Sequence, residues 1–215
     1  MDFSIFNKDS LLFLMEGFYV TLLLSILSIL FSFIIGAMLG IIRFWQIPYI
    51  SKVTGIFIET VRNLPLLLII FFTYFALPEI GIRLPPFAAA VISLTLFTSC
   101  LVAEIVRSGI GGIEKGQWEA GLSCGLSRIQ CLVFIILPQA IRRMIPPLIS
   151  QFVSLNKDTS LAIIISLEEL FRRAQILYAG NVNHVLPVLL LVSIIYFVMN
   201  YALSFAGSRL AVKKV

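Results

Sequence analysis

The sequence predicts an all-α integral membrane protein with five transmembrane helices, and three observations support this fold class. Hydrophobic residues make up 60% of the 215-residue chain and only 13% are charged, whereas soluble domains are about 45–50% apolar and about 25% charged. Several uncharged runs approach the roughly 20 residues that a helix needs to cross the hydrocarbon core. The charged residues are concentrated between these runs. The composition therefore excludes a disordered chain and most cytosolic enzymes.

The first three spans follow from the uncharged runs. Residues 17–42 hold 26 consecutive positions without a charge, which is long enough to cross a bilayer with some tilt. The second run, residues 63–78, has only 16 such positions, so we place this span at 54–78. The third span, 84–103, has 20 uncharged residues and opens on two prolines, which suit a first helical turn.

The last two spans are predicted at 138–156 and 185–207. Only 13 uncharged residues separate Arg143 from Lys157, so the fourth helix must begin upstream of Arg143. The fifth span ends ahead of a basic C-terminal segment. The whole chain, residues 1–215, is then expected to be a single transmembrane domain.

The basic residues predict the orientation of the spans. If the loops after the first and third spans and the C-terminus are cytoplasmic, that side holds 11 of the 16 Lys and Arg residues. Basic residues are enriched in cytoplasmic loops. We therefore expect a multi-pass protein of the cell membrane with its N-terminus outside and its C-terminus in the cytoplasm.

The longest hydrophilic stretch, residues 104–137, joins the third and fourth spans on the predicted cytoplasmic side. Within it, residues 117–126 have the character of a short helix that ends at Gly125. Such a short helix is not stable by itself in water and must dock against the chain's own spans or against a partner. An ordinary loop helix closed by a glycine is the simpler alternative.

The spacing of residues in this loop favours a more specific interpretation. Glu119-Ala120-Gly121 is followed after three residues by Gly125 and, after nine more, by Ile135, with Leu137-Pro138 closing the pattern. This pattern resembles the EAA loop of the permease subunits of ATP-driven (ABC) importers. Gly121 stands where the motif more often has Ala.

Four other segments narrow the resemblance, and they agree in order and spacing over nearly the whole chain: residues 59–67, 103–107, 115–120 and 157–161. They resemble the permeases for polar amino acids of the histidine, glutamine and arginine type. Asn63 departs from the glycine more usual in that family. The resemblance implies the type I ABC importer permease fold and the import of a polar amino acid.

The resemblance also implies a coupling role for the loop and a set of partners. In the family, the loop forms a coupling helix that sits in a groove of a separate ATPase subunit. The residues that it places there are Trp118, Glu119, Ala120, Gly121, Gly125 and Leu126. A second permease chain, identical or similar, and an extracytoplasmic solute-binding protein or domain are the other expected partners.

The chain itself is not expected to be an enzyme or to hold a cofactor. It has no GxxxxGK[ST] phosphate loop, so ATP and Mg are expected on the partner ATPase. Its single histidine and three cysteines form no metal-ligand pattern, which predicts no metal site. We expect no nucleic acid partner, because basic residues in a membrane protein serve first as topology signals.

The polar segment Lys157-Asp158-Thr159-Ser160 is the candidate substrate site. Ionisable groups between apolar runs usually face a cavity or pair with each other, and short or proline-interrupted spans mark substrate sites in transporters. Asp158 can accept an ammonium group, while Lys157 and the two hydroxyls can bind a carboxylate. Thr95 and Thr98 share a face of the third span and can add polar lining.

A structural alternative exists for each of these residues. Lys157 and Asp158 can neutralise each other, Thr159 and Ser160 can cap the next helix, and the two threonines of span three can bond within their own helix. Four Glu/Arg pairs at helical spacing are expected to be structural: Glu59/Arg62, Glu104/Arg107, Glu168/Arg172 and Glu169/Arg173.

Two other functions remain open at this point. An ion-coupled secondary transporter or channel would need no ATPase and would have no reason to carry the loop pattern. An ABC permease for another small polar solute would carry the same loop but a different substrate site.

Overall fold

A computed structural model of the chain describes residues 4–212, which are almost entirely helical. The α-helices are α1 (Lys8–Phe44), α2 (Ile50–Arg62), α3 (Leu66–Phe71), α4 (Pro86–Gly111), α5 (Lys115–Ser123), α6 (Arg128–Cys131), α7 (Leu137–Asp158), α8 (Leu170–Tyr178) and α9 (Val182–Val212). Short π-helical segments, η1 (Phe72–Ala76) and η3 (Leu132–Ile136), and short 3-10 segments, η2 (Leu77–Ile80) and η4 (Thr159–Ile165), continue several of them.

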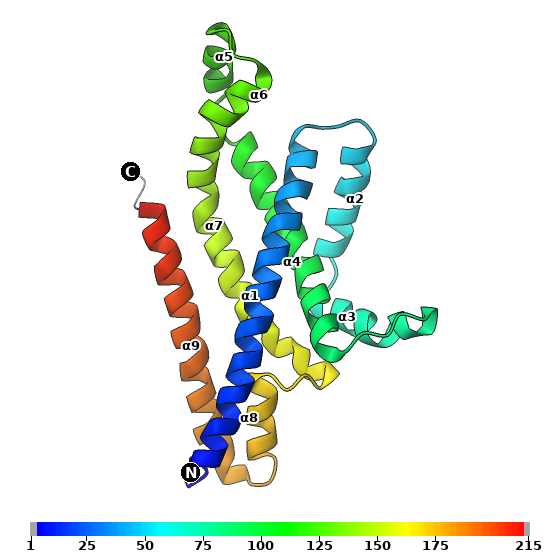
Figure 1. Cartoon of the computed structure of the whole chain (residues 1–215), viewed down its shortest axis with the longest axis vertical. Coiled ribbons are helices and arrows are strands. Elements are labelled where there is room, and N and C mark those ends of the chain that lie inside the picture. Colours follow the sequence, from blue (N-terminus) through cyan, green and yellow to red (C-terminus); the bar gives the residue numbers. More distant parts are fainter. Residues whose placement is uncertain (1–3, 213–215) are drawn as a thin grey trace.

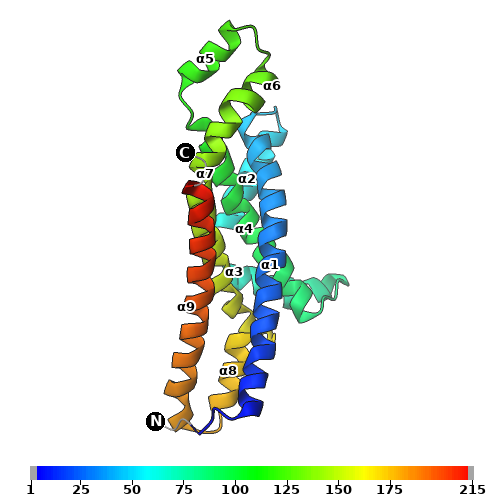
Figure 2. The same ribbon diagram turned by 60° about the vertical axis from the view of Figure 1, so that its left-hand side comes forward.

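The spans form one elongated bundle (Figures 1 and 2). Within the described residues, four helical segments are long and apolar enough to cross a membrane: Lys8–Phe44, Pro86–Gly111, Arg128–Ile165 and Val182–Arg209. The fifth crossing is a broken pair, Ile50–Arg62 with Leu66–Ile80, whose two parts are bent by 101°. The predicted all-α fold with five membrane helices is confirmed.

The second span differs most from its predicted form. The prediction was one helix over residues 54–78, whereas the structure has two parts with a sharp bend between them. Pro65 has no N–H to donate and disfavours helical backbone in the residue before it, so α2 ends at Arg62 and α3 starts in a new direction. The arm formed by α3, η1 and η2 extends sideways from the bundle in Figure 1. Pro146, Pro147 and Pro187 lie inside α7 and α9, so a proline in an apolar run does not by itself indicate a break.

The ends of the other spans also extend beyond the predicted limits. α1 begins at Lys8 because Asn7 caps it, with its side-chain oxygen accepting from the Ser10 N–H at 2.8 Å. α4 continues past Ala103 to Gly111, so the hydrophilic loop begins as helix. An uncharged run therefore locates the apolar part of a helix and not its ends.

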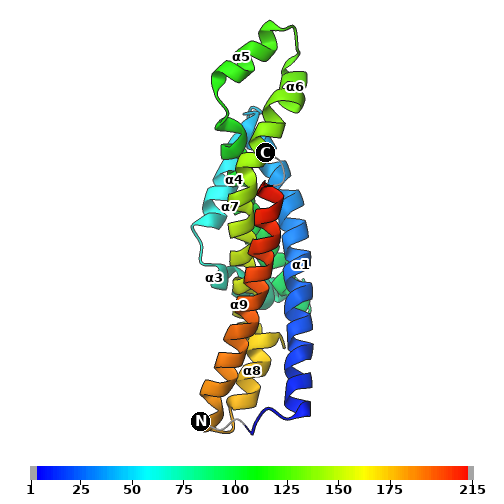
Figure 3. The same cartoon turned by 90° about the vertical axis from the view of Figure 1, so that its left-hand side faces the viewer.

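The two ends of the bundle differ in what they carry. α5 and α6 project beyond the spans at the end where α9 finishes, whereas α8 and the beginning of α1 lie at the opposite end (Figures 1 and 3). The loop between the third and fourth spans and the end of the fifth span are therefore on the same side. This is the relation that the charge pattern predicted.

A row of small side chains lets α1 approach α4 closely. The buried small residues of α1 recur every three or four positions: Gly17, Thr21, Ser25, Ser28, Ser32, Gly36 and Gly40. A Cβ on Gly36 would lie 2.6 Å from the Ser99 carbonyl oxygen, and one on Gly40 would lie 2.6 Å from that of Ala103. Such close backbone packing holds membrane helices together where no hydrophobic driving force acts between them.

Buried amides join the two outer spans to α1. The Ser25 hydroxyl donates to the Asn156 side-chain oxygen at 2.7 Å, and the Asn156 amide donates to the Asn200 side-chain oxygen at 2.9 Å. These residues belong to α1, α7 and α9. Each bond satisfies a polar group that would otherwise face hydrocarbon, so the three helices are fixed in register with one another.

Replacing Gly36 with Val is expected to lower the free energy of unfolding by about 1–3 kcal/mol, the usual cost of overpacking. The added atoms would meet the Ser99 carbonyl and the Val102 side chain. Ile34→Phe is the matched control, because Ile34 is 48% exposed on the same helix. A titration with denaturing detergent measures both variants. Unchanged stability of Gly36→Val would contradict the close contact between α1 and α4.

Candidate functional site

The hairpin of α5 and α6 is docked on its own chain by one face of α5. The half-buried Trp118 ring stacks on Phe44 of α1, with centroids 6.2 Å apart and planes at 22°. Gly121 is buried, and a Cβ there would lie 2.6 Å from the Cys131 sulfur and 2.8 Å from Ile135. A Cβ on Gly116 of the same helix would meet open space. The helix therefore presents its glycine to the chain and its other face outward.

The turn after α5 fixes how the hairpin reverses. Gly125 has a left-handed backbone with φ of 82°, which a residue with a side chain adopts only at a cost. The half-buried Leu126 donates its N–H to the Gly121 carbonyl at 3.2 Å. Ser127 and Gln130 then cap α6 reciprocally. Because both ends of the turn are hydrogen-bonded, α5 and α6 form one unit with the start of the fourth span.

The outward face of α5 carries Glu119 and Ala120, both exposed. Within the described residues, no ion pair involves Glu119. The outward face thus offers an exposed surface with one carboxylate that forms no ion pair among the described residues. Such a surface suits contact with a basic or helix N-terminal group of another subunit.

The predicted substrate segment lies where α7 changes to η4. Lys157 is exposed and Asp158 is half-buried, and no ion pair within the described residues joins them. Thr159 and Ser160 donate their hydroxyl hydrogens to the carbonyls of Asn156 and Lys157, at 2.7 and 2.8 Å. The two hydroxyls therefore bond back to α7 instead of capping a following helix.

Thr95 and Thr98 are buried inside the bundle on α4, with 7% and 1% of their surface exposed. They lie within the same helix as predicted, and the Thr95 hydroxyl has no hydrogen-bond partner among the described residues. No hydrogen bond within the described part of the chain links either threonine to residues 157–160.

A polar stripe along α7, absent from the sequence analysis, leads to this segment. Its polar members are exposed or half-buried and are separated by three, four or seven residues, with Pro146 and Pro147 filling the longest interval: Gln139, Arg143, Ser150, Ser154 and Lys157. The opposite face of α7 holds buried residues such as Met144 and Leu155. Polar groups at membrane depth face water or protein. The sequence signal for this stripe is the helical spacing of the polar residues between positions 139 and 157.

The Glu/Arg pairs of the second and third spans behave differently. Glu104 and Arg107 form the expected pair, with Arg107 Nε 3.0 Å from Glu104 Oε2. Glu59 and Arg62 are both exposed on α2, and no ion pair within the described residues joins them. The exposed charges of α2 are therefore available to water or to another chain.

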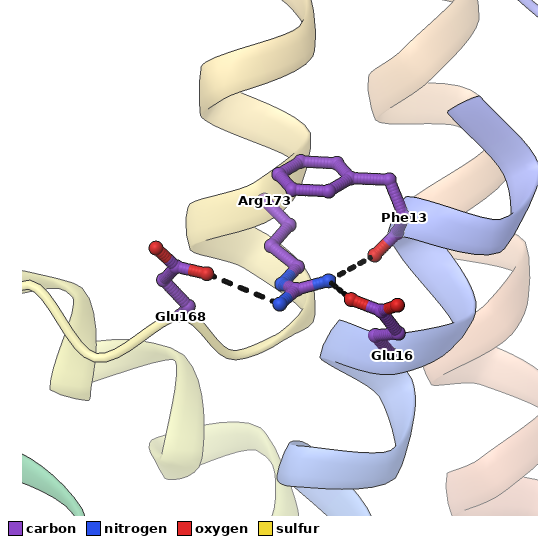
Figure 4. A network of polar contacts seen from close by, with 4 residues as sticks. All are labelled: Phe13, Glu16, Glu168 and Arg173. Atoms are coloured by element: carbon purple, nitrogen blue, oxygen red, sulfur yellow. Dashed lines mark hydrogen bonds and ion pairs between the residues drawn. The ribbon is translucent and has the colours of Figure 1, made fainter. Parts of the chain in front are cut away.

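Arg173 anchors α8 to α1 at the opposite end of the bundle (Figure 4). Its guanidinium donates to the Phe13 carbonyl at 2.9 Å and to the carboxylates of Glu16 and Glu168. It also lies 4.5 Å from the centre of the Phe13 ring. The expected pairing of Arg173 with Glu169 on an exposed helix is wrong, because this side of α8 packs against α1.

Glu169 is instead fully buried and caps α8. Its carboxylate accepts the backbone N–H groups of Phe171 and Arg172 at 2.8 and 2.7 Å and the Tyr196 hydroxyl at 3.1 Å. The expected Glu168/Arg172 pair is also not formed, since Glu168 bonds Arg173 and Arg172 bonds Gln175. Spacing alone did not reveal that Glu169 precedes the helix and faces the interior.

Burial raises the pKa of Glu169 from 4.5 to about 7, because removal from water disfavours the carboxylate more than its three hydrogen bonds favour it. The folded state therefore binds a proton more tightly than the unfolded chain. The resulting contribution to stability is complete below about pH 4.5 and is lost as the pH rises through about 7.

We expect the free energy of unfolding to fall by up to about 3 kcal/mol between about pH 5 and pH 8 through this residue. Glu169→Gln should flatten that part of the pH profile. Glu168→Gln, which changes an exposed neighbour, should leave the slope in place. Unfolding titrations at a series of pH values measure all three proteins. A wild-type profile as flat as that of Glu169→Gln would refute the shifted pKa.

Comparison with known proteins identifies the family of this chain. Residues 28–212 match the family described as "Binding-protein-dependent transport system inner membrane component". The chain belongs to this family. It is thus a multi-pass membrane component of a transport system, as the loop pattern predicted.

Several relatives match over almost their whole length. The chain is 50% identical over 217 residues, covering 100% of both chains, to the probable glutamine ABC transporter permease protein GlnP of Bacillus subtilis (strain 168). It is 39% identical over 199 residues to the glutamine transport system permease protein GlnP of Escherichia coli (strain K12), covering 92% of this chain and 90% of the relative.

Solved structures confirm the type I importer permease fold. A chain from a crystal structure of an amino acid ABC transporter with histidines superposes with a TM-score of 0.85 at 30% identity, covering 93% of this chain and 92% of that one. A chain from the inward-facing MetNI methionine ABC transporter superposes with a TM-score of 0.78 at 20% identity, covering 95% and 97%, and supports the fold alone.

Proposed function

We propose that this permease is the membrane-crossing subunit of an ATP-driven importer of polar amino acids, with ATP hydrolysed on a separate ATPase subunit. The observation that carries the proposal is the α5–α6 hairpin, which is fixed to the fourth span and presents the exposed Glu119 beyond the bundle. The names of the two glutamine permeases and of the amino acid transporter among its relatives support the substrate class.

The hairpin end of the molecule is proposed to lie in the cytoplasm, which places the beginning of α1 and α8 outside. The distribution of 11 of the 16 basic residues supports this orientation. The ATPase would then dock on α5 from the cytoplasm, around Trp118, Glu119, Ala120, Gly121, Gly125 and Leu126. A solute-binding protein would deliver the substrate at the opposite end.

Motion of the ATPase is proposed to reach the membrane through the fourth span. Because Gly121 packs on Cys131 and Ile135, a displacement of α5 must also displace α6 and η3. These elements continue directly into α7, which carries the polar stripe. Rocking of α7 would therefore change the access of the stripe to each side of the membrane.

A second permease chain, identical or similar, is proposed to complete the passage. Most of the polar stripe of α7 and the charges of α2 are exposed among the described residues, and polar surfaces at membrane depth need water or protein beside them. A water-filled passage between two such chains satisfies both surfaces at once.

Lys157 and Asp158 are proposed to bind the amino acid at the end of the stripe. Asp158 accepts the ammonium group and Lys157 donates to the carboxylate. Since Thr159 and Ser160 have given their hydrogens to backbone carbonyls, their oxygens can act only as acceptors. The half-buried Ser160 would therefore contribute toward the ammonium group, whereas the fully buried Thr159 would act through its packing beside the site. The buried Thr95 and Thr98 are assigned to packing around the site.

Glu119→Lys is expected to abolish uptake while leaving membrane insertion and the unfolding midpoint unchanged. Glu119 is exposed and forms no ion pair within the described residues, so its reversal affects only what docks on α5. Glu119→Gln should retain part of the activity because it introduces no repulsive charge. Uptake by the reconstituted complex and a thermal melt of the permease measure the two effects. Normal uptake by Glu119→Lys would refute the coupling role.

Asp158→Asn is expected to raise the KM for uptake by roughly 10- to 100-fold, the effect of losing one charge-assisted hydrogen bond. Initial rates with a panel of glutamine, histidine, arginine and glutamate measure the change. Glu79→Gln is the control, because Glu79 is an exposed carboxylate on the sideways arm. An unchanged KM for every substrate in the panel would place the binding site elsewhere.

A further uptake experiment separates the proposed ATP-driven importer from the alternative, an ion-coupled transporter or channel. Proteoliposomes that contain the permease without its ATPase should take up no amino acid under an ion gradient. Uptake under those conditions would favour the ion-coupled alternative, whatever the effect of Asp158→Asn.

A further inference from the structure

The turn that joins α1 to α2 forms one side of a pocket of about 390 Å³, separate from the hairpin and from the polar stripe. Arg43, Lys52 and Arg107 contribute its charged groups, with Gln46, Tyr49 and Ser51 between them. None of the residues that line it is acidic. Three helices therefore bring three cations to one concave surface.

Neighbouring groups hold two of these cations in place and leave the pocket positive. Arg107 is bonded to Glu104, the carboxylate beside the pocket. Arg43 donates to the Ser51 carbonyl at 3.1 Å and lies so close to Gly55 that a Cβ there would overlap it. Lys52 is exposed and forms no ion pair within the described residues. One carboxylate cannot neutralise three cations, so the pocket favours an anion.

The backbone of the turn adopts conformations that side chains disfavour. Gln46 and Tyr49 have φ of 49° and 63°, in the left-handed region. Strain of this kind persists where the surrounding structure requires it and is concentrated at binding sites. Here it turns the chain so that Arg43 and Lys52 reach the same pocket from two helices.

The margin of the pocket is apolar. This favours an anion that also carries apolar groups over a simple inorganic anion. Exposed fractions are 39% for Ile47, 88% for Tyr49, 54% for Ile50 and 68% for Val53. A free phosphate ion gains nothing from such neighbours. A phospholipid presents a phosphate to the cations and its glycerol and acyl groups to the apolar margin, and tyrosine favours this interfacial depth.

We infer that this pocket binds the phosphate of an anionic phospholipid. The proposed orientation places it at the cytoplasmic leaflet, where anionic lipids concentrate and attract juxtamembrane basic residues. A bound phosphate would bridge α1, α2 and α4 beside the Glu104 pair. It would thereby stabilise the strained turn between the first two spans.

The test uses the full chain in nanodiscs of phosphatidylcholine with a minor fraction of spin-labelled phosphatidylglycerol or, in a parallel sample, spin-labelled phosphatidylcholine. The wild type should retain phosphatidylglycerol in preference to phosphatidylcholine. Lys52→Gln should reduce that preference by about fivefold, the effect of one basic residue at a membrane surface. Arg142→Gln is the control. It removes an exposed cation of α7, which is not among the residues that line the pocket.

A second arm separates the lipid from free phosphate, because inorganic phosphate in the buffer competes only for a simple anion site. Unchanged lipid preference in millimolar phosphate supports the lipid site. Complete displacement by phosphate would overturn it in favour of a soluble ligand. Equal preference for both lipids in the wild type, or an equal loss in Lys52→Gln and Arg142→Gln, would also overturn the inference. Thermal melts of both variants show whether either change simply unfolds the chain.

Discussion

Hydrocarbon offers no hydrogen bonds, and this constraint governs where each polar group of the permease can lie. Within the bundle, the amides of Asn156 and Asn200 and the hydroxyl of Ser25 satisfy one another across three helices. Gly36 and Gly40 let the backbones of α1 and α4 approach where no hydrophobic force would hold them. The polar stripe of α7 meets the same constraint by remaining at the surface of the chain. Its Gln139 and Arg143 are bonded to the Gln117 side chain and to the Gly112 carbonyl, and the rest of its exposed surface must meet water or a second subunit.

The connection between the hairpin and the stripe supplies the route by which the proposed ATPase partner would drive this chain. α6, η3 and α7 are consecutive along the sequence, and α5 is packed on them through a glycine. A force on α5 is therefore applied to the fourth span, and Trp118 extends that contact to the end of α1. The proposed substrate segment lies at the far end of α7. Coupling and transport would then use the two ends of one helix.

Much of this arrangement could be predicted from the sequence, and the exceptions have physical reasons. Uncharged runs located the spans, and the short helix predicted at 117–126 is present as α5, which begins at Lys115 and ends at Ser123, two residues before Gly125. The direction of the chain after Pro65 depends on packing against α4, which no local pattern contains. Spacing suggested a pair between Glu169 and Arg173, but spacing does not tell which face is buried. Lys157 and Asp158 were correctly placed at a break, while the hydroxyls beside them bond to the backbone.

Labelling of Cys124 tests the central claim most directly, because the claim requires α5 to lie in the cytoplasm against a partner. Cys124 is exposed at the end of α5, whereas Cys100 and Cys131 are buried. A membrane-impermeant maleimide should label Cys124 in inside-out vesicles but not in intact cells, and a bound ATPase should protect it. Cys124→Ser supplies the background. Labelling in intact cells, or equal labelling with and without the ATPase, would contradict the account.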